Sequence, residues 1–181
     1  MGRWDDALKF INAALARDPL DPGSYMLLSF IQLGRGRLAE AEAAIRRTLE
    51  ISPTYIPAHC FLGIVLLARS QPEEALAEML KEKDEAGRLG GSAMAYFALG
   101  RKAESDAVLA QMVKDQANHH PFKIAQVYAF RGASDKAFEW LERAYAQKDP
   151  NLVVLKNHEI LKNIESDPRY KAFLRKMNLP E

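Results

Sequence analysis

Few residues in this chain have the types and spacing that catalysis or cofactor binding requires. The run GRGRLA at residues 34–39 has the spacing of a dinucleotide-binding loop that ends in alanine. Such a loop must follow a strand and open a helix, because the pyrophosphate sits on the helix N-terminus. A helical pattern precedes this run, and similar turns recur elsewhere in the chain, so we interpret it as a turn.

Histidine and cysteine occur in two adjacent pairs. His59 precedes Cys60 on a predicted helix, where neighbouring side chains point about 100° apart, and a lone cysteine is usually a small buried hydrophobe. His119 and His120 lack a third ligand at a useful spacing for a metal. The sequence also contains no Walker A or His-Glu-x-x-His motif. It therefore predicts no enzyme, no metal and no other cofactor.

Composition and charge narrow the function further. The 181 residues are 48% hydrophobic and 27% charged, which is enough apolar material for a packed core. Lys and Arg total 25 against 24 Asp and Glu. The chain therefore lacks the excess of positive charge that binding to nucleic acid or to an anionic membrane requires. The longest apolar run, residues 60–68, is far shorter than the ~20 residues that span a bilayer. With one cysteine and no secretory signal, we expect a cytoplasmic protein.

A short pattern recurs along the chain at a fixed interval. Alanines lie 34 residues apart at Ala7, Ala41 and Ala75, and large apolar residues follow them by four at Ile11, Ile45 and Met79. A period of about 34 residues predicts helical hairpins that stack as a solenoid. The small residue lets two antiparallel helices approach closely, and the large residue fills the space beside it.

The period divides the chain into expected hairpins. Residues 22–53 predict two helices joined by a glycine turn, and residues 57–80 repeat the pattern. A helix pair around 93–99 and 104–113 follows, with Ser105 in the alanine column, and residues 121–150 predict a further regular unit. The glycines at 87, 90 and 91 predict a loose linker or a broken helix start before the fourth unit.

These motifs resemble the tetratricopeptide repeat (TPR) family over roughly residues 2–150. The family pattern is matched by Tyr25, Leu28, Ser29, Ala41, Ile45 and Pro53 in one unit, by Leu62, Gly63, Ala75 and Met79 in the next, and by Tyr96 and Tyr128 later. The resemblance implies an all-α superhelix of about four and a half antiparallel hairpins over residues 1–150, closed by a C-terminal helical cap over 151–181. It also implies a scaffold for protein–protein contacts.

In this family the first helix of each hairpin lines the concave side of the superhelix. Carried over by register, the resemblance predicts a partner-binding groove formed by Met26, Phe30, Leu33, Cys60, Ile64, Leu67, Met94, Phe97, Phe122, Gln126 and Phe130. Methionines and aromatic residues suit an adaptable groove that holds an amphipathic helix or an apolar peptide. The alternative for each of these residues is packing between neighbouring first helices.

The two ends of the chain depart from the repeat. Gly2-Arg3-Trp4 aligns with the interior turn at residues 36–38, so we expect either a fragment of a longer protein or a half-repeat that acts as a cap. The first helix then lacks a partner on the face of Ala7, Ile11 and Ala14, where two copies could pair as a homodimer. After Pro150 the pattern predicts a short helix, a connector and a last amphipathic helix.

A second resemblance favours an alternative function. The stretches YFALGRKAESD, KAFEWLERAY and SDPRYKAFLRKMNLP are similar to the tails of large bacterial signalling proteins. In those proteins a repeat array follows an output domain such as a nucleotide cyclase. The alternative is therefore a regulatory or oligomerisation tail of a larger signalling enzyme, although no residue of such a catalytic domain occurs in this chain.

Overall fold

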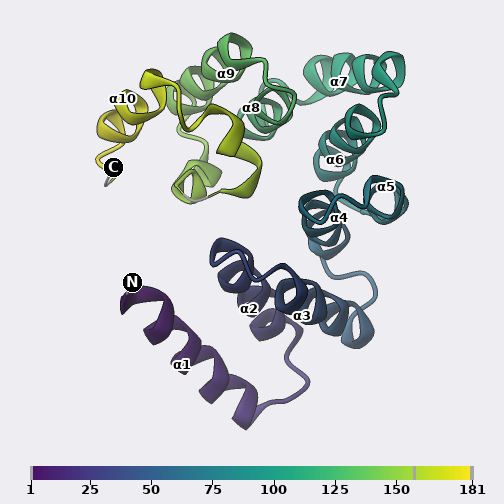
Figure 1. Cartoon of the computed structure of the whole chain (residues 1–181), viewed down its shortest axis with the longest axis vertical. Helices are drawn as coiled ribbons and strands as arrows, with labels where there is room; N and C mark the ends of the chain where they lie inside the picture. The colour runs from purple at the N-terminus through teal and green to yellow at the C-terminus, as the bar shows by residue number, and fades with distance from the viewer. Residues whose placement is uncertain (1, 157, 180–181) are drawn as a thin grey trace. The chain divides into compact units, whose positions relative to one another are not determined.

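The computed structural model describes residues 2–156 and 158–179, and every regular element in that part of the chain is helical (Figure 1). The all-α prediction is thus confirmed. In chain order the elements are α1 (Gly2–Arg17), α2 (Pro22–Gly34), α3 (Leu38–Ile51), α4 (Ala58–Ala68), α5 (Pro72–Met79), α6 (Glu85–Ala98), α7 (Lys102–Gln116), α8 (Pro121–Phe130), α9 (Ser134–Ala146), the 3-10 helices η1 (Pro150–Val154) and η2 (Glu159–Ile164), and α10 (Pro168–Lys176).

Consecutive helices pack as the hairpins that the period predicts. The pairs α2–α3, α4–α5 and α8–α9 make extensive contacts. The turns of the first and last of these pairs contain Gly36 and Gly132 with φ near +70°, a left-handed conformation that glycine adopts without steric cost. Ser70 takes the same conformation between α4 and α5. The short polar turns therefore fix where each pair reverses direction.

A small residue on the first helix of each hairpin faces a large residue on the second. A Cβ atom added to Gly63 would lie 2.4 Å from Met79 Cγ, so the backbone of α4 directly contacts this methionine. Met79 is fully buried. The same 16-residue spacing separates Ser29 from Ile45, Ala93 from Leu109 and Ala125 from Leu141, and all six of these residues are buried. This column explains the sequence period.

The chain forms two compact units, residues 1–88 and 89–181. In unit 1, Trp4 of α1 packs over Gly34, and Arg35 Nη1 lies 2.9 Å from Asp5 Oδ1. The buried carboxylate of Glu82 accepts a hydrogen bond from the amide of Cys60 at 3.0 Å. Because the first amides of a helix have no partner within it, Glu82 caps α4 from the segment that follows α5.

The glycine-rich segment differs from the sequence-based expectation. It is helical: α6 begins at Glu85 and continues through Gly87, Gly90 and Gly91. A Cβ atom at Gly90 would lie 3.2 Å from Met112 Cε, so glycine permits close packing within unit 2. Ser105 is fully buried and its hydroxyl donates to the carbonyl oxygen of Ala93 at 2.7 Å. It therefore occupies the alanine column of its hairpin.

The C-terminal segment packs on the last hairpin of unit 2. The predicted short helix is wrong in detail, because two 3-10 helices, η1 and η2, take its place. The side chains of Leu155, Leu161 and Ile164 are fully buried, and Tyr170 Oη donates to the carbonyl oxygen of Leu155 at 3.0 Å. The division of the chain at residue 150 into repeats and cap stays a prediction.

Helix α10 continues the repeat spacing that the sequence pattern loses. Arg169 pairs with Asp135, and Lys176 pairs with Glu142. Both pairs join residues that are 34 apart, which is the repeat period. Because both partners advance by seven residues from one pair to the next, α10 runs parallel to α9. It therefore lies where the second helix of a further hairpin would lie.

Candidate protein-interaction surface

The predicted groove residues divide by burial. Buried are Met26, Leu33, Ile64, Met94 and Phe122, whereas Phe30, Cys60, Leu67, Phe97, Gln126 and Phe130 are half-buried. Buried members pack between helices, and half-buried members can contribute accessible area to a partner. The groove itself stays a prediction, and only its half-buried members can contact a partner without repacking of the core.

In unit 1 three accessible or half-buried apolar residues lie on the first helices α2 and α4. The rings of Phe30 and Phe61 meet edge to face with centroids 4.0 Å apart. Leu27, one turn before Phe30, is 56% exposed. We call Leu27, Phe30 and Phe61 the α2–α4 strip. Sequence reasoning missed Leu27 and Phe61, although their spacing of 34 residues marks them as equivalent positions.

Cys60 lies next to Phe61 of this strip, and its contacts stabilise the fold. Its amide donates to Glu82, as described above, and its Sγ lies 3.6 Å from the carbonyl oxygen of Gly87. Its neighbour His59 points elsewhere, with Nδ1 2.8 Å from Glu78 Oε2 and Nε2 3.2 Å from the carbonyl oxygen of Pro53. The two side chains do not form a joint site. In the part of the chain that the structure describes, no group of three or more His, Cys, Asp or Glu is placed to hold a metal ion.

In unit 2 the equivalent face of α8 is covered by the chain itself. The ring of His158 meets Phe122 edge to face at 6.1 Å between centroids, and the amide nitrogen of Gln126 lies 2.9 Å from His158 Nε2. Asn163 Nδ2 donates to the carbonyl oxygen of Phe130 at 2.9 Å. Three predicted groove residues therefore contact the segment at residues 158–164 rather than an open channel.

Burial of His158 makes unit 2 sensitive to acid. Burial lowers the pKa of His158 from 6.5 to about 4. Between these values the unfolded chain binds a proton at His158 that the folded chain does not, so the contribution of this residue to stability is constant above about pH 6.5 and falls as the pH drops toward 4. We expect His158 to contribute a loss of about 3 kcal/mol between pH 7 and pH 4, measured by urea denaturation. In the variant His158→Gln this part of the loss should vanish, and an unchanged pH dependence would contradict the assignment.

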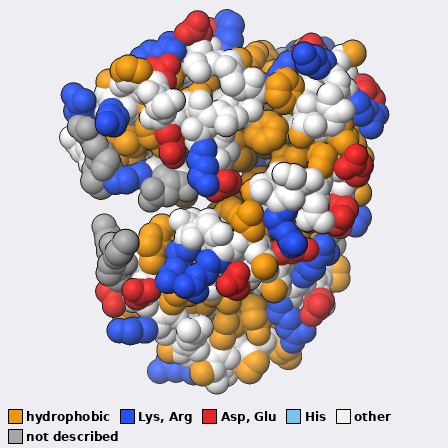
Figure 2. All heavy atoms as spheres, viewed as in Figure 1, with side chains coloured by type: hydrophobic (Ala, Val, Ile, Leu, Met, Phe, Trp, Pro, Cys, Tyr) orange, Lys and Arg blue, Asp and Glu red, His pale blue; other side chains and the backbone are white. Residues whose placement is uncertain are grey.

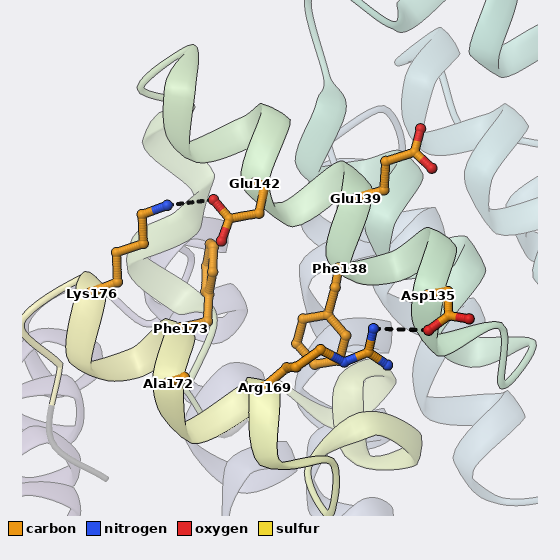
Figure 3. Close-up of a pocket in the computed structure, with 8 residues that line it drawn as sticks. All are labelled: Asp135, Phe138, Glu139, Glu142, Arg169, Ala172, Phe173 and Lys176. Atoms are coloured by element: carbon orange, nitrogen blue, oxygen red, sulfur yellow. Dashed lines mark hydrogen bonds and ion pairs between the residues drawn. The ribbon is translucent and has the colours of Figure 1, made fainter.

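A hollow lies between α9 and α10 (Figure 3). Its volume is about 410 Å³, and Phe138 and Phe173 are buried beneath it. Arg169 crosses one end toward Asp135 with its guanidinium carbon 4.5 Å from the centre of the Phe138 ring, and Lys176 closes the other end by pairing with Glu142. The two ion pairs therefore join α10 to α9 across the hollow.

The comparisons with known proteins agree with this arrangement. A family model described as tetratricopeptide repeat matches residues 1–56. A thermophilic TPR protein of Thermus thermophilus superposes with a TM-score of 0.65 at 22% identity, covering 96% of this chain and 92% of its own. The fold is that of a tetratricopeptide repeat protein. No curated protein matches the sequence.

Two other solved structures superpose on this chain. PilW, a widely conserved type IV pilus biogenesis factor, superposes with a TM-score of 0.61 at 18% identity, covering 96% of this chain and 85% of its own. YrrB, a TPR protein with an unusual peptide-binding site, superposes with a TM-score of 0.54 at 19% identity, covering 85% of this chain and 82% of its own. At these identities the likeness concerns the fold alone. Among the described residues, no helix combines the length and hydrophobicity needed to cross a bilayer.

Proposed function

We propose that this protein is a scaffold that binds another protein or a peptide along the first helices of its hairpins, and that it catalyses no reaction itself. The observation that supports this most directly is the α2–α4 strip. Leu27 exposes more than half of its surface beside the half-buried rings of Phe30 and Phe61. Large apolar residues that remain accessible on a first-helix face are anchors of the kind that peptide grooves use.

The bound partner, we infer, is centred on unit 1. In unit 2 the residues at 158–164 already cover α8, where Gln126 and Phe122 contact His158. The corresponding face of α2 has Leu27 exposed instead. A partner that lays an apolar helix or peptide against the strip would bury this leucine together with the edge of the Phe30 ring.

Charge supports a protein partner over a polyanion. Lys and Arg are interspersed with Asp and Glu on the face that Figure 2 shows, and the whole sequence has a net charge of +1. Nucleic-acid-binding surfaces concentrate positive charge in a patch or stripe. Interspersed charges of both signs around apolar anchors instead resemble the polar rim of a protein interface.

The test uses a library of random 15-residue peptides displayed on phage and selected against the full chain. Selected peptides should be amphipathic, and Leu27→Glu should weaken their binding at least about tenfold in fluorescence polarisation, because a charge would enter the buried centre of the interface. Leu80→Glu is the matched control, since Leu80 is 51% exposed at the end of α5. Peptides that bind Leu27→Glu as well as the wild type would refute the proposed site.

The alternative, a regulatory or oligomerisation tail of a larger signalling enzyme, is supported only by the resemblance of the three tail stretches. It is compatible with peptide binding, because a repeat array can hold a segment of its own polypeptide. Sequencing of the gene on both sides of this chain tests it directly. A cytoplasmic location likewise stays a prediction from the sequence.

A further inference from the structure

Helix α1 exposes a face that the equivalent helices bury. Phe10 is 77% exposed, whereas Ala44, 34 residues later on α3, is 5% exposed. Trp140 occupies the same place on α9, counted from its hairpin's alanine, and is 7% exposed. The exposed face of α1 is therefore apolar at a position that is covered on α3 and α9.

The neighbours of Phe10 on α1 are also more exposed than their equivalents on α3. Ala7 and Ile11 are half-buried and Ala14 is exposed, whereas their equivalents on α3, Ala41, Ile45 and Thr48, are fully buried. We call Ala7, Phe10, Ile11 and Ala14 the α1 face. Spacings of three and four residues place them on one side of the helix.

Two opposite charges flank the α1 face on one edge. Asp6 and Arg17 are both exposed and lie eleven residues apart, which is about three turns, so their side chains leave the helix in nearly the same direction. Lys9 Nζ lies 3.9 Å from Asp6 Oδ1, and both side chains are largely exposed, so this contact is loose. The edge thus has a negative N-terminal end and a positive C-terminal end.

We propose that the α1 face pairs with α1 of a second copy of this chain in an antiparallel, two-fold symmetric dimer. A two-fold axis between Phe10 and Ile11 places Ala7 of one helix opposite Ala14 of its partner, so each pair of small residues leaves room for the large ones. The same axis brings Arg17 beside the partner's Asp6. The contact occurs twice, because the interface is isologous.

The charges decide between this pairing and its alternatives. In a two-fold symmetric parallel pair this edge of one helix would lie on the opposite side of the seam from the same edge of its partner, so Asp6 and Arg17 would make no contact between the copies. The antiparallel pair instead brings the two edges together and joins opposite charges. The 16-residue helix is about 24 Å long. One such pair buries less area than the ~1,200–2,000 Å² of standard stable interfaces. The dimer is therefore weak and forms reversibly at high concentration.

Sedimentation velocity of the full chain tests this pairing between about 10 μM and 1 mM, a range that brackets weak association. The weight-average mass of the wild type should rise from monomer toward dimer. Ala14→Glu should remove this rise. Asn12→Glu adds the same charge on the same helix at an exposed position on the side away from the α1 face, and it should dimerise like the wild type. A wild type that stays monomeric throughout overturns the proposal.

Charge exchange tests the orientation. Asp6→Arg and Arg17→Asp should each weaken dimerisation about three- to tenfold, because each replaces two attractive contacts with two repulsive ones. The double variant should restore the wild-type association within about twofold, since each contact again joins opposite charges. Failure of this rescue overturns the antiparallel arrangement. Leu27→Glu should leave the dimer unchanged, so the outcome is independent of the proposed peptide site.

Discussion

Replacement of Gly63 with alanine is expected to destabilise unit 1 by about 2 kcal/mol. An added Cβ would lie 2.4 Å from Cγ and 2.7 Å from Cε of Met79, which is fully buried and has no free space to enter. Helix propensity alone would favour alanine by up to about 1 kcal/mol, so the sign of the effect distinguishes packing from propensity. Urea denaturation gives the free energy of unfolding, and hydrogen exchange of α4 and α5 locates the change.

Gly90→Ala is the matched control. Gly90 is also a buried helical glycine that faces a methionine, but the only tight contact of its added Cβ would be with the terminal methyl of Met112, at 3.2 Å; Met112 Sδ at 3.5 Å and Val127 Cγ2 at 3.6 Å would be in ordinary van der Waals contact. That methyl can rotate away, so the expected change in unfolding free energy is within about 0.5 kcal/mol. Equal stabilisation of both variants would show that α4 and α5 are not in the close contact described.

Truncation of Leu161 to alanine is expected to destabilise unit 2 by about 3 kcal/mol. Leu161 lies on η2, is fully buried, and belongs to the segment that covers α8. The cavity left by its side chain would weaken the attachment of the whole segment to the last hairpin. The melting temperature, followed by the fluorescence of Trp140 on α9, should fall by on the order of 10 °C.

The neighbouring residue Lys162 provides the comparison. Its side chain is exposed and pairs with Glu159 at 2.6 Å, a surface contact of small energetic value. Lys162→Ala should therefore change stability by less than about 0.5 kcal/mol. If Leu161→Ala melted like Lys162→Ala, η2 would not be part of the core of unit 2.

The hairpins could be predicted because their contacts repeat. The column of small residues and the large residues beside them recur at intervals of 34, 30 and 32 positions, and each contact, such as Gly63 with Met79, is local within one hairpin. The helix across Gly87, Gly90 and Gly91 could not be predicted in the same way. Glycine has low intrinsic helix propensity, so three glycines in one segment predict a break. Glycine is nevertheless favoured at residue 90 because Met112 packs closely against it, and Met112 belongs to a different helix, α7.

The candidate surface could be predicted from the sequence only in part. Register places Met26 and Phe30 on the same helix face, but it does not reveal that Met26 is buried while Leu27 is largely exposed. Nor could it reveal that His158 and Asn163 cover α8, because that contact joins residues about 32 positions apart through an irregular segment. Burial depends on what packs against a helix, and the helix's own periodicity does not encode it.

The ion pairs from α9 to α10 have a consequence for how this protein can be lengthened. Arg169 and Lys176 lie one period beyond Asp135 and Glu142, so the tail is a hairpin whose leading helix has been replaced by two short 3-10 turns. A designer could restore a regular helix between residues 150 and 164 and then append further modules after α10. The outward side chains of α10, Lys171 and Arg175, are exposed and basic. They would first have to be exchanged for apolar residues, because charged side chains at that end prevent another module from docking.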